Sequence, residues 1–259
     1  MRVRTSTVAA ALLCGLTQAA ALAAPLQFCY EDAPQAPWTM PDGSGLNIEL
    51  LRRVARMTGD EFQFFARPWK RCQEETRGGR MDGMIGGADA PDRRSYTVLP
   101  SLADGSVNTE KAIYHDHASV YIRVGSGVSW DGKELINPRG IVVAQRGYYV
   151  AEILQQRGQR VLDTVKSVED GLRMVVAGMA DVAVLQGRAA EELVHDDPRF
   201  RGKIELARQP YVDLPLFLHI SRKTYDRDPK RIEAIWNAIP VVRASPEFRK
   251  LEHEARRED

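Results

Sequence analysis

Alternating strand and helix patterns between residues 26 and 86 restrict the fold more than any other feature of this sequence. Three short apolar segments are predicted strands: Leu26–Tyr30, Glu61–Ala66 and Met81–Gly86. Apolar residues recur at helical spacing from Leu46 until Gly59, and a second helix is predicted to begin at Pro68 and to end at Gly78. The order strand–helix–strand–helix–strand is typical of a doubly wound α/β domain, whose ligands bind beyond the carboxyl ends of the strands.

The same alternation starts again near residue 119, which indicates a second α/β unit. Its predicted strands are Val120–Val124, Gly140–Gln145 and Asp181–Gln186. A late extended segment and a final helix complete the chain. This pattern predicts two lobes: residues 24–116 with 213–259 form the first, and residues 117–212 form the second. The chain would cross between the lobes at hinges near Tyr114–Tyr121 and Leu206–Leu216.

The first 23 residues have the layout of a secretory signal peptide. Basic residues precede an apolar segment from Val8 to Leu22, and small residues at Ala21 and Ala23 fit a cleavage site, which we place after Ala23. Loss of Arg2 and Arg4 with this segment takes the formal charge from +1 to −1, a balance that argues against nucleic-acid binding. No later apolar segment is long enough to span a bilayer. We therefore expect an exported, periplasmic protein.

Cleavage leaves two of the three cysteines. Cys14 lies in the signal peptide, whereas Cys29 and Cys72 stay in the mature chain. An even number of cysteines in an exported protein predicts a disulfide between them, with two free buried thiols as the alternative. The five histidines are scattered and no zinc-ligand spacing occurs, so neither a metal site nor a cofactor is predicted.

Candidate ligand-binding residues follow the ends of predicted strands. Gly86 and Gly87 leave the backbone bare, and Arg93 carries a planar fork of N–H donors that fits a carboxylate. Arg94, one residue further along, is the rival for this role. The full set of predicted ligand-binding residues is Trp38, Gly86, Gly87, Arg93, Arg146, Tyr148 and Gln186. No residue is assigned a catalytic role, because the chain contains neither a Gly-x-Ser-x-Gly nor a His-Glu-x-x-His motif.

The order and spacing of several short motifs resemble the periplasmic solute-binding proteins of polar-amino-acid ABC uptake systems, bacterial extracellular solute-binding protein family 3. The motifs are a proline-aromatic loop at Ala36–Trp38, a helix start at Gly45–Glu49, a turn at Gly79–Asp82, a clamp segment at Gly86–Arg93 and a strand at Gly178–Leu185. They span nearly the whole mature chain. Trp69–Cys72, together with Cys29, looks like a less studied branch of that family.

The resemblance implies a Venus-flytrap fold that holds a solute between the lobes. Arg93 would bind the carboxylate of the solute beside the backbone of Gly86 or Gly87, and Trp38 would form an apolar wall. Such a protein would act as a monomer that captures a small carboxylate-bearing solute, an amino acid or a related organic acid. It would deliver the solute to an ABC permease, and it would not be an enzyme.

Two other functions occur on the same fold. Exported cyclohexadienyl dehydratases need a carboxylic acid in the cleft to protonate a leaving hydroxyl, for which Glu31, Asp32 and Asp89 are the nearby candidates. A sensor or partner-binding module would use the same two lobes without transport. Permease and ATPase genes beside this one would favour uptake over sensing.

The second lobe departs from the family pattern at Gln186. Amino-acid binders of this type usually place an aspartate or glutamate there to pair with the ammonium group of the ligand, and a glutamine cannot supply that charge. Either another acid, such as Glu31, Asp32 or Asp89, reaches the ammonium from the first lobe, or the ligand has no cationic centre. The sequence leads us to favour the second explanation, because Arg146 would add positive charge to the second lobe.

Overall fold

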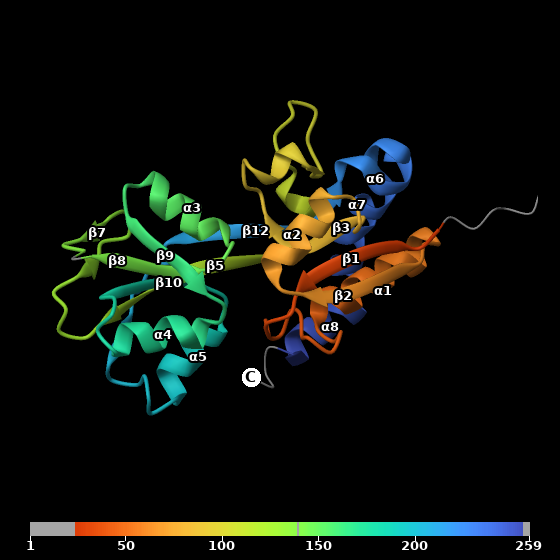
Figure 1. Ribbon diagram of the computed structural model, residues 1–259. Coiled ribbons are helices and arrows are strands. Elements are labelled where there is room, and N and C mark those ends of the chain that lie inside the picture. The colour runs from red at the N-terminus through yellow and green to blue at the C-terminus, as the bar shows by residue number, and fades with distance from the viewer. Residues whose placement is uncertain (1–23, 139, 256–259) are drawn as a thin grey trace, which may run out of the picture.

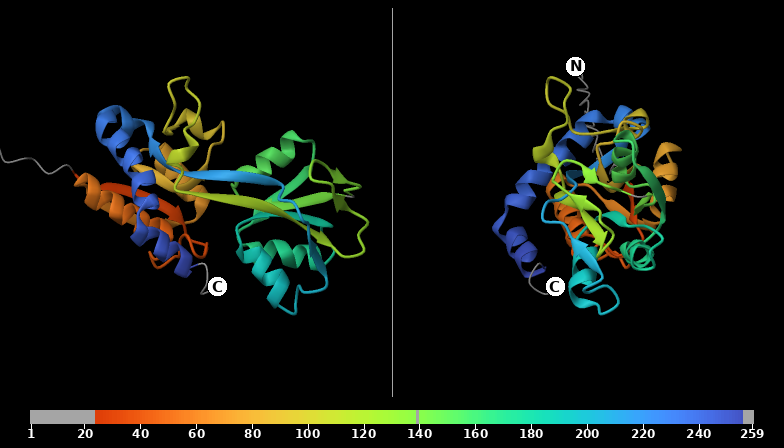
Figure 2. Two further views of the ribbon diagram at one scale, coloured as in Figure 1. Left: turned by 180° about the vertical axis from the view of Figure 1, so that it is seen from behind. Right: turned by 90° about the vertical axis from the view of Figure 1, so that its left-hand side faces the viewer.

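Two lobes are connected by two long antiparallel strands, β5 (Tyr114–Arg123) and β12 (Val212–Ser221), in a computed structural model that describes residues 24–138 and 140–255 (Figure 1). Figure 2 shows both strands running from one lobe into the other. The predicted two-lobed α/β fold is thereby confirmed. The predicted signal peptide, residues 1–23, lies outside the described residues.

The first lobe is built on the predicted alternation of strands and helices. Its elements are β1 (Leu26–Glu31), α1 (Leu46–Thr58), β2 (Phe62–Arg67), α2 (Trp69–Arg77) and β3 (Gly83–Ala88). Strand β1 pairs in parallel with both β2 and β3, so the carboxyl ends of all three strands share one edge. Gly59 ends α1 in the left-handed conformation, with φ 76°.

The end of the chain returns to the first lobe and completes it. Strand β12 pairs antiparallel with β3 and with the short β4 (Thr97–Val98). Three helices follow: α6 (Arg222–Arg227), α7 (Pro229–Ala244) and α8 (Pro246–Ala255). Two 3₁₀ turns lie in the intervening chain, at Arg93–Ser95 and Thr109–Lys111. No helix within the described ranges is both long and apolar enough to cross a membrane.

The second lobe repeats the alternation with elements of similar length. They are β8 (Ile141–Gln145), α3 (Tyr149–Gln156), β9 (Arg160–Val165), α4 (Val168–Val176) and β10 (Val182–Gln186). Strand β8 pairs in parallel with β9 and β10, and β10 pairs antiparallel with β5. One sheet therefore continues through both lobes in the order β2-β1-β3-β12-β5-β10-β8-β9.

Some elements of the second lobe go beyond what the sequence patterns predict: β6 (Ser129–Trp130), β7 (Leu135–Ile136), α5 (Ala189–Asp196) and β11 (Ile204–Leu206). The three strands have only two or three residues, so no period of two is visible in them. Strand β5 begins at Tyr114 rather than at the predicted Val120. Its first half alternates buried and exposed residues, as a strand does, but it includes two histidines, so no continuous apolar segment marks it in the sequence.

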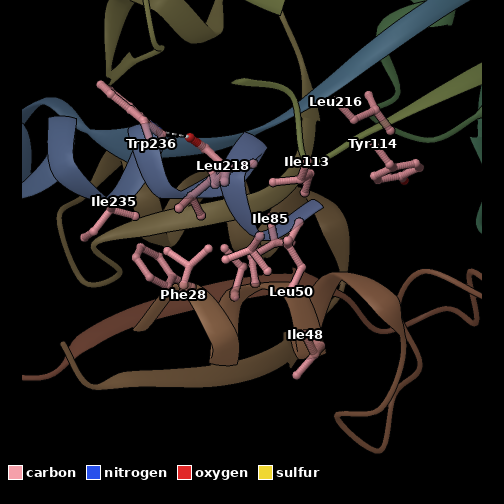
Figure 3. Close-up of a cluster of buried hydrophobic side chains, with 14 of the residues drawn as sticks. Phe28, Ile48, Leu50, Ile85, Ile113, Tyr114, Leu216, Leu218, Ile235 and Trp236 are labelled. Carbon is pink, nitrogen blue, oxygen red and sulfur yellow. Dashed lines mark hydrogen bonds between the residues drawn. The ribbon is translucent and has the colours of Figure 1, made fainter. Parts of the chain in front are cut away.

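Each lobe has a hydrophobic core of its own. Figure 3 shows the core of the first lobe, to which Phe28 comes from β1, Leu50 from α1 and Ile235 from α7. Trp236 is fully buried there, and its indole N–H donates to the Leu218 carbonyl at 3.0 Å. A separate cluster surrounds β8 and β10 in the second lobe. Full burial of one such side chain contributes about 1.5–3 kcal/mol, so both lobes carry their own stabilisation.

The predicted disulfide between Cys29 and Cys72 is confirmed, with 5.6 Å between the two Cα atoms. It fastens α2 to β1, the central parallel strand of the first lobe. Cys72 shares one face of α2 with Trp69, Gln73 and Thr76, and all four side chains are buried. In the chain-entropy model a loop of this length stabilises the fold by about 4 kcal/mol.

The disulfide leads to a simple expectation for the exported protein. Thiol titration of denatured, unreduced mature chain should find essentially no free thiol. The same titration after reduction should find both Cys29 and Cys72. Two reactive thiols before reduction would contradict the bond.

Candidate functional site

A small cavity lies between the lobes, at the carboxyl edge of the parallel strands. Most of its walls come from the first lobe, and Tyr148, Tyr149 and Gln186 come from the second. Its other polar and glycine residues are Glu31, Gln35, Thr39, Asn47, Gly86, Arg93 and Tyr114. The described residues contain no cluster of three or more side chains suited to hold a metal ion.

Arg93 is the buried cation of this cavity, with 2% of its surface exposed. It follows β3 in a short 3₁₀ turn, which aims its guanidinium into the space between the lobes. One terminal nitrogen donates to the Ala88 carbonyl at 3.0 Å and the other to the Gly147 carbonyl at 3.1 Å, while Nε has no partner. Burial lowers the pKa of Arg93.

Arg93 also lacks a counterion, since no carboxylate among the described residues forms an ion pair with it. A guanidinium has five N–H donors, and two are in use here. The remaining donors are suited to an anion that enters the cavity. Arg94 is exposed and pairs with Asp89 instead, so of these two neighbouring arginines only Arg93 lines the cavity.

Glu31 is the acidic residue that ends β1 and lines the cavity. Burial raises its pKa to about 8, and the neighbouring Asp32 carboxyl adds to the shift. Glu31 is therefore neutral at pH 7 and can donate a hydrogen bond from its carboxyl group. The other two acids proposed from the sequence lie elsewhere: Asp32 is exposed, and Asp89 is the partner of Arg94.

Asp116 is a buried acid that the sequence patterns do not single out. It lies on β5 with 7% of its surface exposed, and its Oδ2 accepts a hydrogen bond of 3.0 Å from Nε2 of the cavity residue Gln186. Burial raises the pKa of Asp116, and hydrogen bonds from His117 and Gln186 oppose that shift. No lysine or arginine among the described residues forms an ion pair with it.

The position of Asp116 could have been found from the strand period. Residues two apart on a strand share a face, so Asp116 shares its face with Tyr114, which lines the cavity, and with the buried Ala118. Burial and then the charge of Asp116 raise the pKa of Tyr114. Asp116 therefore lies directly behind the wall formed by Gln186 and Tyr114.

Four of the seven predicted ligand-binding residues line the cavity: Gly86, Arg93, Tyr148 and Gln186. Trp38 lies one layer behind it and stacks on Tyr114, with 4.4 Å between the ring centroids. The side-chain position of Gly87 points away from the cavity, because a Cβ added there would lie 2.6 Å from the imidazole of His219. Arg146 is exposed and lies outside the lining, so it adds no positive charge to the wall.

No family model and no curated protein matches the sequence, whereas many solved structures share its fold. The GluR0 ligand-binding core from Nostoc punctiforme in complex with L-glutamate has a TM-score of 0.68 at 18% identity, with 89% of this chain and 98% of that chain covered. A histidine kinase sensor domain with similarity to periplasmic binding proteins has a TM-score of 0.67 at 15% identity, with coverages of 89% and 95%.

A third similar structure is a putative ABC transporter binding component from Wolinella succinogenes complexed with lysine. Its TM-score is 0.66 at 15% identity, with 90% of this chain and 96% of that chain covered. The TM-scores and coverages establish the fold of periplasmic binding proteins. Because the sequence identities are low, the function has to be argued from the site.

Glu31 should make the stability of the protein depend on pH. Its carboxyl has a pKa of 4.5 without the fold and about 8 within it, so the folded chain holds the proton more tightly. This stabilisation is complete below the unfolded value and is lost as the pH rises through the folded value. Glu31→Gln cannot lose a proton, so the midpoint of urea unfolding should fall less between about pH 5 and about pH 8 than in the native protein.

The matched control is Glu61→Gln, the same change at an exposed glutamate. It should keep the pH dependence of the native chain. Identical curves for native protein and Glu31→Gln would contradict the assignment of the proton to Glu31.

Proposed function

We propose that this chain is an exported solute-binding protein that captures a small amino acid, or a close zwitterionic relative, between its lobes. It delivers this solute to an ABC permease in the membrane. The observation that carries the proposal is a buried guanidinium and a buried carboxyl group, Arg93 and Asp116, which lie on or directly behind the walls of one cavity and form no ion pair with a described residue.

Buried charges of this kind are costly unless they are paired, with an effective penalty of several kcal/mol per ion. Arg93 and Asp116 do not pair with each other, and backbone or amide dipoles are their only described hydrogen-bond partners. A solute with one carboxylate and one ammonium group supplies both missing partners. Asp116 is therefore an acid that can bind the ammonium group in place of the neutral Gln186. A ligand with a cationic centre becomes the better expectation, in place of the ligand without one that the sequence favoured.

The similar structures support a binding role. The Nostoc punctiforme core is complexed with L-glutamate, and the Wolinella succinogenes protein, a putative ABC transporter binding component, is complexed with lysine. We extend this role to delivery to a permease by a monomeric protein, which reaches the periplasm after cleavage of residues 1–23. The disulfide between Cys29 and Cys72 fits such an oxidising compartment.

The dehydratase alternative can be separated from binding by direct assay. Of the three acids considered from the sequence, only Glu31 lines the cavity, and its raised pKa would suit a proton donor. We favour binding over catalysis, because a charged solute would supply the missing partners of Arg93 and Asp116 without any bond being broken. Incubation with prephenate should leave it unchanged, and the appearance of phenylpyruvate would reverse this order.

Arg93→Ala should remove most of the affinity for the bound amino acid while the fold persists. Loss of a charged, hydrogen-bonded partner from a buried site costs about 2–5 kcal/mol, which is more than about tenfold in Kd. Calorimetric titration measures this loss, and circular dichroism checks the fold. Arg94→Ala is the control and should bind normally, since Arg94 is exposed and pairs with Asp89. The opposite pattern would show that Arg94 is the clamp.

Asp116→Asn should weaken binding of amino acids and spare acids without an amine. The change keeps the shape of the side chain and removes the charge that a buried ammonium needs. Thermal-shift screening of L-amino acids beside their deaminated analogues gives the measurement. Native protein should be stabilised by an amino acid and not by its deaminated analogue. The Asp116→Asn variant should lose at least about tenfold in affinity for the amino acid.

The matched control for Asp116→Asn is Asp213→Asn, the same change at an exposed position of the other connecting strand, β12. It should bind like the native chain. Equal stabilisation of native protein by an amino acid and by its deaminated analogue would contradict the role of Asp116.

A further inference from the structure

The carbonyl oxygen of Gly147 forms hydrogen bonds that connect the two lobes. Gly147 belongs to the turn between β8 and α3 of the second lobe. Its oxygen accepts three hydrogen bonds from the first lobe, each of 3.1 Å, from Nε1 of Trp69, Nε2 of Gln73 and Nη2 of Arg93. With φ at 75°, in the left-handed region, Gly147 adopts a conformation that favours glycine.

Two of these three donors make no other described side-chain hydrogen bond, although the Trp69 ring also lines the cavity and lies 5.7 Å from the Arg93 guanidinium carbon. Arg93 has further N–H groups for a solute, whereas the only hydrogen bond described for each of the Trp69 and Gln73 side chains is the one to Gly147. Both side chains are buried, with exposures of 7% and 5%. Their bonds to the second lobe therefore need no solute between the lobes.

The disulfide fixes the helix face that carries these donors. Trp69 and Gln73 lie three residues before and one residue after Cys72 on α2, and Cys72 is bonded to Cys29 on β1. The next residue of the second lobe, Tyr148, packs against the cluster of Cys29, Cys72 and Trp69. Its hydroxyl also accepts a hydrogen bond of 2.8 Å from Nε2 of Gln35 in the first lobe.

We propose that Trp69 and Gln73 form, with the Gly147 carbonyl, a clasp that holds the two lobes closed in the absence of solute, and that the Cys29–Cys72 disulfide keeps this clasp in position. The closed form is then the resting state, and a solute enters during brief openings. On solute binding Arg93 can turn to the new carboxylate, while Trp69 and Gln73 keep hold of Gly147. Trp69 and Gln73 act here as positioning residues.

The clasp can be tested by measuring the distance between the lobes without any ligand. Pro34 and Lys166 are exposed residues that line opposite walls of one groove between the lobes, and spin labels on cysteines placed there report its width. The protein is unfolded, dialysed free of solute and refolded with its disulfide oxidised. Double electron–electron resonance then gives the populations of short and long distances. This measurement does not depend on which solute the protein binds, so it stands apart from the proposed function.

The expected result is a mainly short distance in the native chain. Trp69→Phe and Gln73→Met each remove one N–H donor and keep much of the side-chain volume. Each should lower the ratio of closed to open protein by about twofold to tenfold, and the two together by more. The matched controls are Trp236→Phe, which removes an indole N–H bonded within the first lobe, and Gln63→Met at an exposed position of β2. Both should leave the distances unchanged.

Two results would overturn the proposal. One is a native chain that is mainly open without solute. The other is a Trp69→Phe/Gln73→Met double variant with the same distance distribution as the native chain.

Discussion

A buried guanidinium without a counterion is the constraint on which the site depends. Arg93 is held by two backbone carbonyls, one from each lobe, and its Nε is unsatisfied. Carbonyl dipoles compensate a buried cation only in part, so the cavity favours any small anion that reaches these donors. In the proposed function, the buried carboxyl group of Asp116 favours a cation for the same reason, and the two residues together favour a zwitterion over a simple anion.

The scaffold places Arg93 and Asp116 and connects the two lobes through only two long strands. A single sheet runs through both lobes, and β5 and β12 are the two strands that cross between them (Figure 2). Because each lobe has its own hydrophobic core, bending at these strands exposes little of either core. Asp116 sits on β5 itself, whereas Arg93 and the disulfide-fixed α2 belong to the first lobe and Gly147 to the second.

The sequence was sufficient to predict the strands, the disulfide and the location of Arg93 beyond the carboxyl end of a strand, because each depends on a local pattern. Periodicity locates β1, β3 and β10, and an even cysteine count locates the bond. It could not place Trp38 or Gly87, since which side of a loop or strand end faces the cavity depends on the packing of Tyr114 and His219. Asp116 was missed because two histidines beside it make the start of β5 resemble a polar linker.

Native mass spectrometry of the freshly exported protein tests the central claim most directly. The account predicts a retained small solute that carries both a carboxylate and an amine, present in the native chain and in Arg94→Ala and lost from Arg93→Ala. A retained solute that lacks either group, or one that stays bound after Arg93→Ala, would contradict the pairing of a zwitterion with Arg93 and Asp116.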